Sequence, residues 1–294
     1  MAIEARKPET QEEARRNFRG GVKPIWCPGC GDHAVLAGLS DALAALGLET
    51  ANVAVITGIG CSSRLPGYLS CYGFNAIHGR AIPIATGVKL SRPEATVIAA
   101  GGDGDGFSIG GGHLMHAVRR NLDMTYIVMD NGIYGLTKGQ ASPTTPMGVR
   151  TKTTTTGAYE EPIHPLQIML AYGTTYVAQG FAGDLRYLST LFQDAIKHPG
   201  FSFVDVVCPC PTYRGGMEQY RTLKAMQHML TPDNHDESSW EEAQRLAREP
   251  GVMHIGVFYR ERRATYGETL THLRETALKG KPAPRVEALA EMYR

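Results

Sequence analysis

Short apolar runs alternate, along the first two thirds of the chain, with longer segments of mixed apolar and polar positions. The runs are rich in β-branched residues and end at glycine or polar residues, which is typical of strands buried on both faces. The longer segments repeat their apolar positions with the period of a helix. We therefore expect strands at residues 52–57, 95–100, 125–130 and 201–207, and helices at residues 33–46, 109–120 and 185–198.

This alternation predicts an α/β fold, in which a parallel sheet carries helices on both faces. Gly47 is placed to end the first helix. Residues 142–162 form a long loop, and long loops inside compact domains are usually functional or disordered. After Tyr213 the alternation stops, and an apolar run at 252–259 interrupts a polar sequence. We expect a mobile lead-in, a main cofactor-binding domain and a helix-rich C-terminal extension, at residues 1–22, 23–213 and 214–294.

Composition and charge narrow the class of protein. Apolar residues make up 43% of the chain and charged residues 20%, which is ordinary for a soluble globular protein. The formal net charge of +1 gives no reason to expect nucleic acid or a membrane surface as a partner. The charged start, residues 1–19, does not resemble a signal peptide, and no apolar run is long enough for a transmembrane helix. We expect a cytoplasmic protein, in which six cysteines are better explained as ligands or bystanders than as disulfides.

The most informative segment is GGDGDGFSIGGGH, which begins at Gly101 directly after a predicted strand. The next predicted strand ends in Asp130 and Asn131. Asp103 and Asn131 are 28 residues apart in sequence, but parallel strands bring their carboxyl ends to one edge of the sheet, where ligands bind. A carboxylate and an amide oxygen at that edge can hold Mg²⁺, which prefers oxygen ligands and retains phosphate oxygens in its shell. Gly102 and Gly104 would let the backbone approach a phosphate.

Two other interpretations of this segment are weaker. A lone GDG is more often a tight turn between a strand and a helix, but here a strand ending in Asp-Asn follows at crossover distance. The dinucleotide-binding fingerprint requires G-x-G-x-x-G and a later acidic residue for the ribose, and Asp130 lies too close to Asn131 and its loop to fill that role. We therefore favour a diphosphate bound through Mg²⁺.

The cysteines suggest a second cofactor. Cys27 and Cys30 form a C-x-x-C pair, Cys61 follows a predicted strand, and Cys208 and Cys210 follow another. Four thiolates suit a [4Fe–4S] cluster or a structural Zn²⁺, and the scattered spacing fits a cluster better because zinc sites usually pair two C-x₂-C knuckles. Cys71 has the features of a bystander.

The WCPGC segment also resembles a thioredoxin-type redox site superficially. Such a pair normally follows a strand, and the preceding KPI is short and broken by proline. The pair does precede a predicted helix, so this alternative stays open.

Several motifs together resemble the β subunits of 2-oxoacid:ferredoxin oxidoreductases. GDG followed by an asparagine at this distance looks like the thiamin diphosphate signature, and GDGDGFSIGGGH, MDNGIYGLTKGQ, HGRAIPIATGVKL and GVFYRERRATY are similar to segments of that family. The resemblance extends from about residue 23 to residue 266. It implies a thiamin diphosphate enzyme of 2-oxoglutarate type, with Mg²⁺ and one [4Fe–4S] cluster.

The resemblance also implies roles for individual residues. The cluster ligands would be Cys27, Cys30, Cys61 and Cys210, although Cys208 stands where the family has a serine, which leaves the choice between Cys208 and Cys210 in doubt. Asp103, Asn131 and the carbonyl of Ile133 would hold Mg²⁺. The cofactor would be lined by Ile59, Gly60, Cys61, Ser62, His78, Gly102, Gly104, Asp105, Ile133, Tyr134, Gly135 and Leu136.

Two residues are catalytic candidates. Unaided, His78 is more often an ordinary loop histidine and Lys138 a solvated charge, but the resemblance places His78 beside the cofactor. Lys138 lies a few residues after the metal-binding loop, in TKGQ where pyruvate enzymes of the family often have TGGQ. A lysine there could pair with the distal carboxylate of 2-oxoglutarate, or with the carboxylate that all 2-oxoacids share. Pyruvate or several 2-oxoacids remain alternative substrates.

By this resemblance the chain is incomplete as an enzyme. Thiamin activation needs a glutamate from another domain, so we expect an α subunit, an (αβ)₂ assembly, coenzyme A as acyl acceptor and ferredoxin as electron acceptor. Two rival classes are a non-oxidative thiamin enzyme, which a colourless protein would support, and a non-catalytic iron–sulfur or zinc protein, which bound thiamin diphosphate would exclude.

Overall fold

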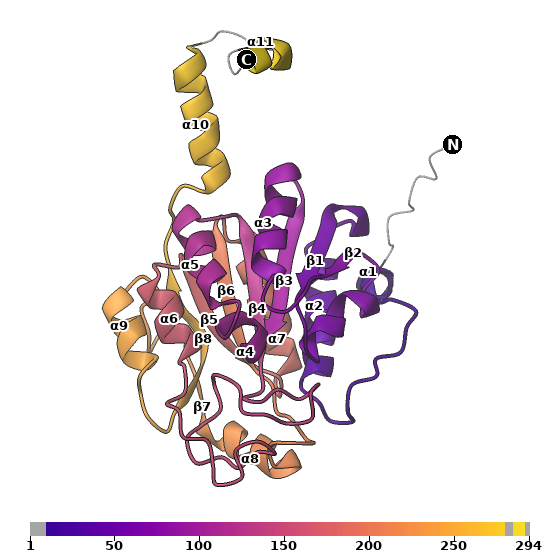
Figure 1. Ribbon diagram of the computed structural model, residues 1–294, viewed down its shortest axis with the longest axis vertical. Helices are drawn as coiled ribbons and strands as arrows, with labels where there is room; N and C mark the ends of the chain where they lie inside the picture. Colours follow the sequence, from indigo (N-terminus) through magenta and orange to yellow (C-terminus); the bar gives the residue numbers. More distant parts are fainter. Residues whose placement is uncertain (1–9, 280–284, 292–294) are drawn as a thin grey trace.

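The computed structural model describes residues 10–279 and 285–291, which fold around one mixed sheet (Figure 1). The strands, in spatial order, are β2 (Tyr72–Asn75), β1 (Val53–Thr57), β3 (Thr96–Gly102), β4 (Met124–Asp130), β6 (Phe201–Val207), β5 (Tyr176–Phe181), β8 (Met253–Arg260) and β7 (Gln227–Met229). The six strands from β2 to β5 are mutually parallel. β8 pairs antiparallel with β5, and β7 runs parallel to β8.

Helices cover both faces of this sheet, as the alternating pattern predicts. The α-helices are α1 (Gln11–Phe18), α2 (Asp32–Ala45), α3 (Ala81–Ser91), α4 (Asp103–Phe107), α5 (Gly111–Arg120), α6 (Pro165–Ala171), α7 (Leu185–Lys197), α8 (Gly216–Met226), α9 (Trp240–Leu246), α10 (Tyr266–Leu278) and α11 (Val286–Glu291). Among these, no helix is long and apolar enough to cross a membrane. Figure 1 shows α10, in yellow, projecting away from the sheet.

The strands are apolar throughout because each face of the sheet has its own core. In β1, Val53 and Val55 pack on one face with α2 and α7, whereas Ala54 and Ile56 pack on the other with α3 and α5. Side chains alternate between the faces of a strand, so burial on both sides removes the polar positions that a half-exposed strand would show. This is the physical basis of the continuous apolar runs in the sequence.

The predicted elements are present, with boundaries shifted by one or two residues in most cases. The helix expected at 109–120 begins at Gly111, and the separate short helix α4 precedes it. Gly47 has a φ of 64° directly after the first predicted helix, as a C-terminal glycine requires. The pattern did not predict β2, α3, α6 or β5.

The structure describes parts of both expected end segments. In the described part of the lead-in, Phe18 of α1 is buried in the core, and Arg15 forms an ion pair with Asp41 of α2. The C-terminal extension contributes to the sheet, since the apolar run at 252–259 becomes β8 and β7 adds a further strand. The alternation ends after Tyr213 because these two strands pair with each other and with β5, not as successive crossover units.

Candidate active site

A pocket opens where the chain changes direction in the sheet. From β1 the chain continues outward to β2 and then returns to the other side of β1 to form β3. In open α/β sheets such a switch point leaves a crevice at the carboxyl ends of the strands, where ligands bind. The pocket lies at the carboxyl ends of β1, β3 and β4, and its lining residues are Ile59, Gly60, Cys61, Ser62, His78, Gly102, Asp103, Gly104, Asp105, Asn131, Ile133, Tyr134, Gly135, Leu136 and Thr137.

The structure brings Asp103 and Asn131 together in this pocket. β3 and β4 are adjacent and parallel, with Gly102 opposite Met129. Asp103 is buried and accepts a hydrogen bond from the backbone N–H of Asn131, and burial raises the pKa of its carboxyl. The side-chain oxygen of Asn131 accepts a hydrogen bond from the backbone N–H of Ile133 at 3.0 Å, which fixes its orientation.

These oxygens fit a magnesium ion. Mg²⁺ takes hard oxygen ligands, commonly one or two carboxylates together with phosphate oxygens. Asp103 offers a carboxylate held by the hydroxyl of Thr144 at 2.8 Å, and Asn131 offers an amide oxygen beside it. Such a metal would be held mainly by oxygens that the protein has already oriented.

Asp105 lines the pocket and organises one of its walls. Its carboxylate accepts hydrogen bonds from the backbone N–H groups of Ile59 at 2.9 Å and Gly79 at 2.7 Å. Burial raises the pKa of Asp105, and the Nδ1 atom of His78 lies 3.6 Å away. One buried side chain therefore holds the loops that follow β1 and β2 against the start of α4.

Glycines allow the backbone to pack closely around these groups. A Cβ atom on Gly104 would lie 2.2 Å from the ring of Tyr134, and one on Gly58 would lie 2.1 Å from the carboxylate of Asp105. Both distances are much shorter than a van der Waals contact. A side chain at either position would push a pocket residue out of place.

The cysteine segments meet beside the same pocket. The indole N–H of Trp26 donates to the carbonyl of Cys61 at 2.7 Å, and the N–H of Gly31 donates to the carbonyl of Pro209 at 3.3 Å. These bonds hold the Cys27–Cys30 turn against the loops that carry Cys61 and Cys210.

The thiols are also close enough for the charge of one to shift the pKa of another. Burial, together with the charges of Asp32, Cys210 and Cys27, raises the pKa of Cys61 to about 11. Cys30 is affected in the same direction by Cys61 and Cys210. Among residues 10–279 and 285–291, no three His, Cys, Asp or Glu side chains surround a single metal ion. A [4Fe–4S] cluster does not require that arrangement, because each cysteine binds a different iron atom.

Cys208 and Cys210 have different surroundings. Cys208 is 1% exposed and packs in the core against Gly31, where an added Cβ would lie 2.8 Å from the Cα of Cys208. Its N–H donates to the carbonyl of Asp130 at 2.7 Å. Cys210 is nearer the surface, in a loop whose backbone N–H groups at Thr212 and Tyr213 act on its sulfur. Cys208 is thus part of the packed core, whereas Cys210 lies in the loop that follows it.

Lys138 is exposed and does not line the pocket, although its neighbour Thr137 does. Its φ is 82°, an unusual value for a lysine, within the tight turn that ends with Gly139. His78, in contrast, lines the pocket as expected. In the chain by itself, Lys138 is therefore not in position for the expected contact with a substrate in this pocket.

The sequence did not point to Thr144, Tyr213 or Arg214 as part of this region. Thr144 lies in the loop at 142–162, whose length was the available signal of function. The hydroxyl of Thr144 contacts Asp103, whereas Tyr213 packs on the turn at Gly139 and Arg214 reaches Gly132. Common residue types in loops can be recognised as part of a site only when the folded structure shows which loops meet.

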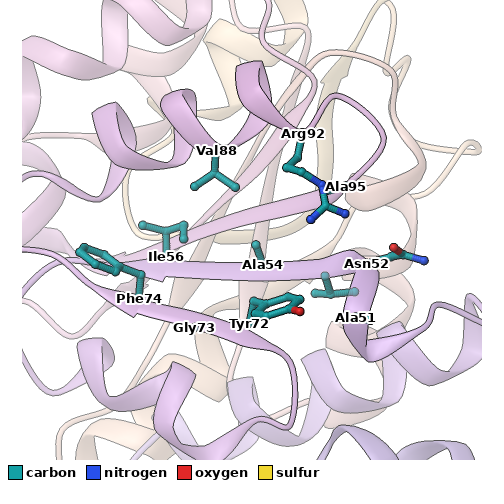
Figure 2. A pocket seen from close by; sticks show the side chains of 11 residues that line it. Ala51, Asn52, Ala54, Ile56, Tyr72, Gly73, Phe74, Val88, Arg92 and Ala95 are labelled. Carbon is teal, nitrogen blue, oxygen red and sulfur yellow. The ribbon is translucent and has the colours of Figure 1, made fainter. Parts of the chain in front are cut away.

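A second hollow lies at the outer edge of the sheet, between β2 and α3. Figure 2 shows Tyr72 of β2 beside Ala54 of β1 and Phe74 beside Ile56, with Val88 of α3 across the hollow. Of the residues that line it, only Arg92 is charged, and it pairs with Glu94. This hollow has no convergent polar groups, so it does not compete with the first pocket as a candidate active site.

Comparisons with known proteins agree with this geometry. Residues 49–206 match the family model described as thiamine pyrophosphate enzyme, C-terminal TPP binding domain. Residues 210–275 match the family model for the C-terminal part of the pyruvate ferredoxin oxidoreductase beta chain. Fold and pocket thus define the diphosphate-binding part of a thiamin diphosphate enzyme. More narrowly, the chain belongs to the family of 2-oxoacid:ferredoxin oxidoreductase β subunits, as the following relatives establish.

Two curated relatives and one solved structure are similar over long stretches. The β subunit of 2-oxoacid:ferredoxin oxidoreductase 2 from Aeropyrum pernix is 47% identical over 192 residues, 65% of this chain and 62% of that protein. The 2-oxoglutarate synthase subunit KorB of Archaeoglobus fulgidus is 38% identical over 87% of this chain and 92% of the relative. The 2-oxoglutarate:ferredoxin oxidoreductase from Magnetococcus marinus, solved with 2-oxoglutarate, coenzyme A and succinyl-CoA bound, is 41% identical with a TM-score of 0.89, covering 95% of this chain and 96% of that one.

Proposed function

We propose that this chain is the β subunit of an enzyme that oxidatively decarboxylates 2-oxoglutarate to succinyl-CoA and CO₂ and passes the electrons to ferredoxin. The observation that carries the proposal is the placement of Asp103, Asn131 and Cys61 around one pocket. The first two suit a metal-bound diphosphate, and the third joins that pocket to the other cysteines. A non-oxidative thiamin enzyme would have no use for this connection.

In the proposed site the chain binds and orients the cofactor. Asp103, Asn131 and the carbonyl of Ile133 would hold Mg²⁺, and the loop after β1 would lie along the diphosphate. The hydroxyl of Ser62 is buried in the pocket without a hydrogen-bond partner, which suits an anionic ligand there. When bound, thiamin diphosphate supplies a carbanion that attacks the keto group and an electron sink for the decarboxylation.

The proposed cluster ligands are Cys27, Cys30, Cys61 and Cys210. Their fit rests on the two hydrogen bonds that tie the three cysteine segments together and on the mutual influence of the thiols. Cys61 would belong to both the cluster site and the diphosphate site, because it also lines the pocket. The backbone around Cys61 would therefore place the two proposed cofactors close to each other.

A partner subunit is part of the proposal. Ile59 and Leu136 are 43% and 44% exposed at the pocket although both are apolar, and exposed apolar residues at a site often mark a surface that another chain covers. We propose an α subunit in that place, in an (αβ)₂ assembly. The relatives named as subunits support this arrangement.

The substrate rests on the relatives and not on an observed contact. The KorB relatives are 2-oxoglutarate enzymes by name, and the Magnetococcus marinus structure contains 2-oxoglutarate and coenzyme A. Pyruvate is the second candidate, because the C-terminal family model takes its name from pyruvate ferredoxin oxidoreductase. Lys138 is the proposed contact that would separate the two.

The test is a purified complex, obtained by co-expression of this chain with its partner subunit under anaerobic conditions. We expect a brown protein that contains iron and extractable thiamin diphosphate. It should reduce ferredoxin with 2-oxoglutarate and coenzyme A, with kcat/KM higher than for pyruvate. A colourless but decarboxylating complex would contradict the oxidative function, and a preference for pyruvate would contradict the substrate.

A further inference from the structure

Arg214 stands between the two proposed cofactor sites. Its backbone N–H donates to the carbonyl of Cys210 at 3.1 Å, so it belongs to the cysteine loop. Its guanidinium donates to the carbonyl of Gly132, over a long 3.5 Å, in the loop that carries Asn131. A Cβ on Gly132 would lie 3.6 Å from the centre of that guanidinium, which shows close approach.

The contact is part of a wider packing of one loop on the other. The ring of Tyr213 lies so close to Gly139 that an added Cβ there would be 2.8 Å away. The carbonyl of Gly132 also accepts a hydrogen bond from the hydroxyl of Thr145 at 2.7 Å. The position of Arg214 is therefore fixed by its surroundings, and its side chain is half-buried.

Nearby buried carboxyl groups give a physical reason for an arginine at position 214. Asp103 and Asp130 are both buried, and burial raises the pKa of each. The charges of Asp130, Asp103 and Cys210 all act on the guanidinium of Arg214. A buried anion without a cationic partner is costly, and an arginine remains charged under all ordinary conditions. Arg214 supplies positive charge to both sites at once.

We infer that Arg214 is a positioning residue that ties the cysteine loop to the metal-binding loop and whose charge favours the reduced form of the cluster. The inference rests on the proposed function and extends it to the coupling between the two sites. A positive charge near the cluster stabilises the extra electron by Coulomb attraction. The hydrogen bond to Gly132 keeps the metal-binding loop in register for Mg²⁺ and the diphosphate.

Two variants of the co-expressed complex separate the charge from the hydrogen bond. In Arg214→Gln, the reduced-to-oxidised ratio of the cluster at a fixed solution potential should fall by about tenfold, because a unit charge is lost nearby. Arg214→Lys keeps the charge and should keep the midpoint potential. Both variants should bind thiamin diphosphate with Mg²⁺ several-fold more weakly, because neither reproduces the arginine fork. The measurements are a redox titration followed by EPR and calorimetry of cofactor binding.

Arg221→Gln is the matched control, since Arg221 is exposed on α8 and pairs only loosely with Glu218. It should leave both measurements unchanged. An unaltered midpoint in Arg214→Gln overturns the inference, and so does an equal shift in Arg221→Gln. If Arg214→Gln loses its cluster during purification, Arg214→Lys decides alone: normal cofactor affinity in that variant overturns the tether. A wild-type complex without iron would overturn the proposed function and this inference with it.

Discussion

The hydroxyl oxygen of Thr144 lies 2.8 Å from a carboxylate oxygen of Asp103 and also 2.8 Å from one of Asp130. A hydroxyl group has one proton to donate, so it can donate to only one of these acids and must accept from the other. Burial raises the pKa of both carboxyls, and the charge of Asp103 raises that of Asp130 further. Thr144 therefore links two buried acids, and of these two Asp103 is the one that lines the pocket.

Replacing Thr144 by valine should weaken Mg²⁺-dependent binding of thiamin diphosphate. The change removes a hydrogen bond to a charged group, worth about 1.5–3 kcal/mol, so the Kd for the cofactor should rise by about one to two powers of ten. Calorimetry at fixed Mg²⁺ measures this. Thr190→Val, on the exposed side of α7, is the control and should bind normally; equal affinities in the two variants would contradict the role of Thr144.

Asp103→Ala should abolish the stabilisation that Mg²⁺ and thiamin diphosphate together give to the folded protein. A ligand that binds only the native state raises the melting temperature, and the shift disappears when the site is lost. Iron content should be unchanged, because Asp103 is not a cluster ligand. Asp233→Ala, at an exposed position, should retain the full shift, and full cofactor occupancy in Asp103→Ala would disprove the metal site.

The cysteine assignment predicts three different results. Cys210→Ala should remove the brown colour and the iron, and Cys71→Ala should leave both in place. Cys208→Ala should keep the iron but lower the melting temperature, because Cys208 fills space in the core. Iron analysis, absorbance and thermal melting test this set. Loss of iron in Cys208→Ala with retention in Cys210→Ala would reverse the assignment.

Gly104→Ala should lose thiamin diphosphate through steric displacement. The new methyl group would lie 2.2 Å from the ring of Tyr134, so Tyr134 must move out of the pocket wall. Gly112→Ala is the matched control, since no atom lies within 4 Å of its added Cβ and alanine favours a helix. Normal cofactor binding by Gly104→Ala would show that this wall of the pocket is adaptable.

Lys138→Met tests substrate choice. Because Lys138 is exposed, a pair with the distal carboxylate of 2-oxoglutarate should be worth at most about 1 kcal/mol, and kcat/KM should fall by less than about tenfold. The value for pyruvate should not change. An equal loss for both substrates would mean that Lys138 contacts the carboxylate that they share.

The sequence by itself determined the sheet-and-helix alternation, the meeting of Asp103 and Asn131 at one pocket, and the three cysteine segments. Strands buried on both faces leave continuous apolar runs, and parallel strands bring their carboxyl ends to one edge. The order of residues alone was therefore enough to place Asp103 and Asn131 together. Local sequence carries this information because it depends only on strand direction and burial.

Tertiary structure alone decided which loops meet. Edge strand β2 is short and exposed, and β5 carries the pattern YVAQGF, whose packing partners lie in β6 and β8, so neither has a distinct signal of its own. The run at 252–259 gave no sign that it would pair with β5, because strand pairing is chosen by the whole fold. Thr144 and Arg214 acquire their contacts in the same way: each is an ordinary loop residue until the folded sheet brings its loop beside Asp103 or Gly132.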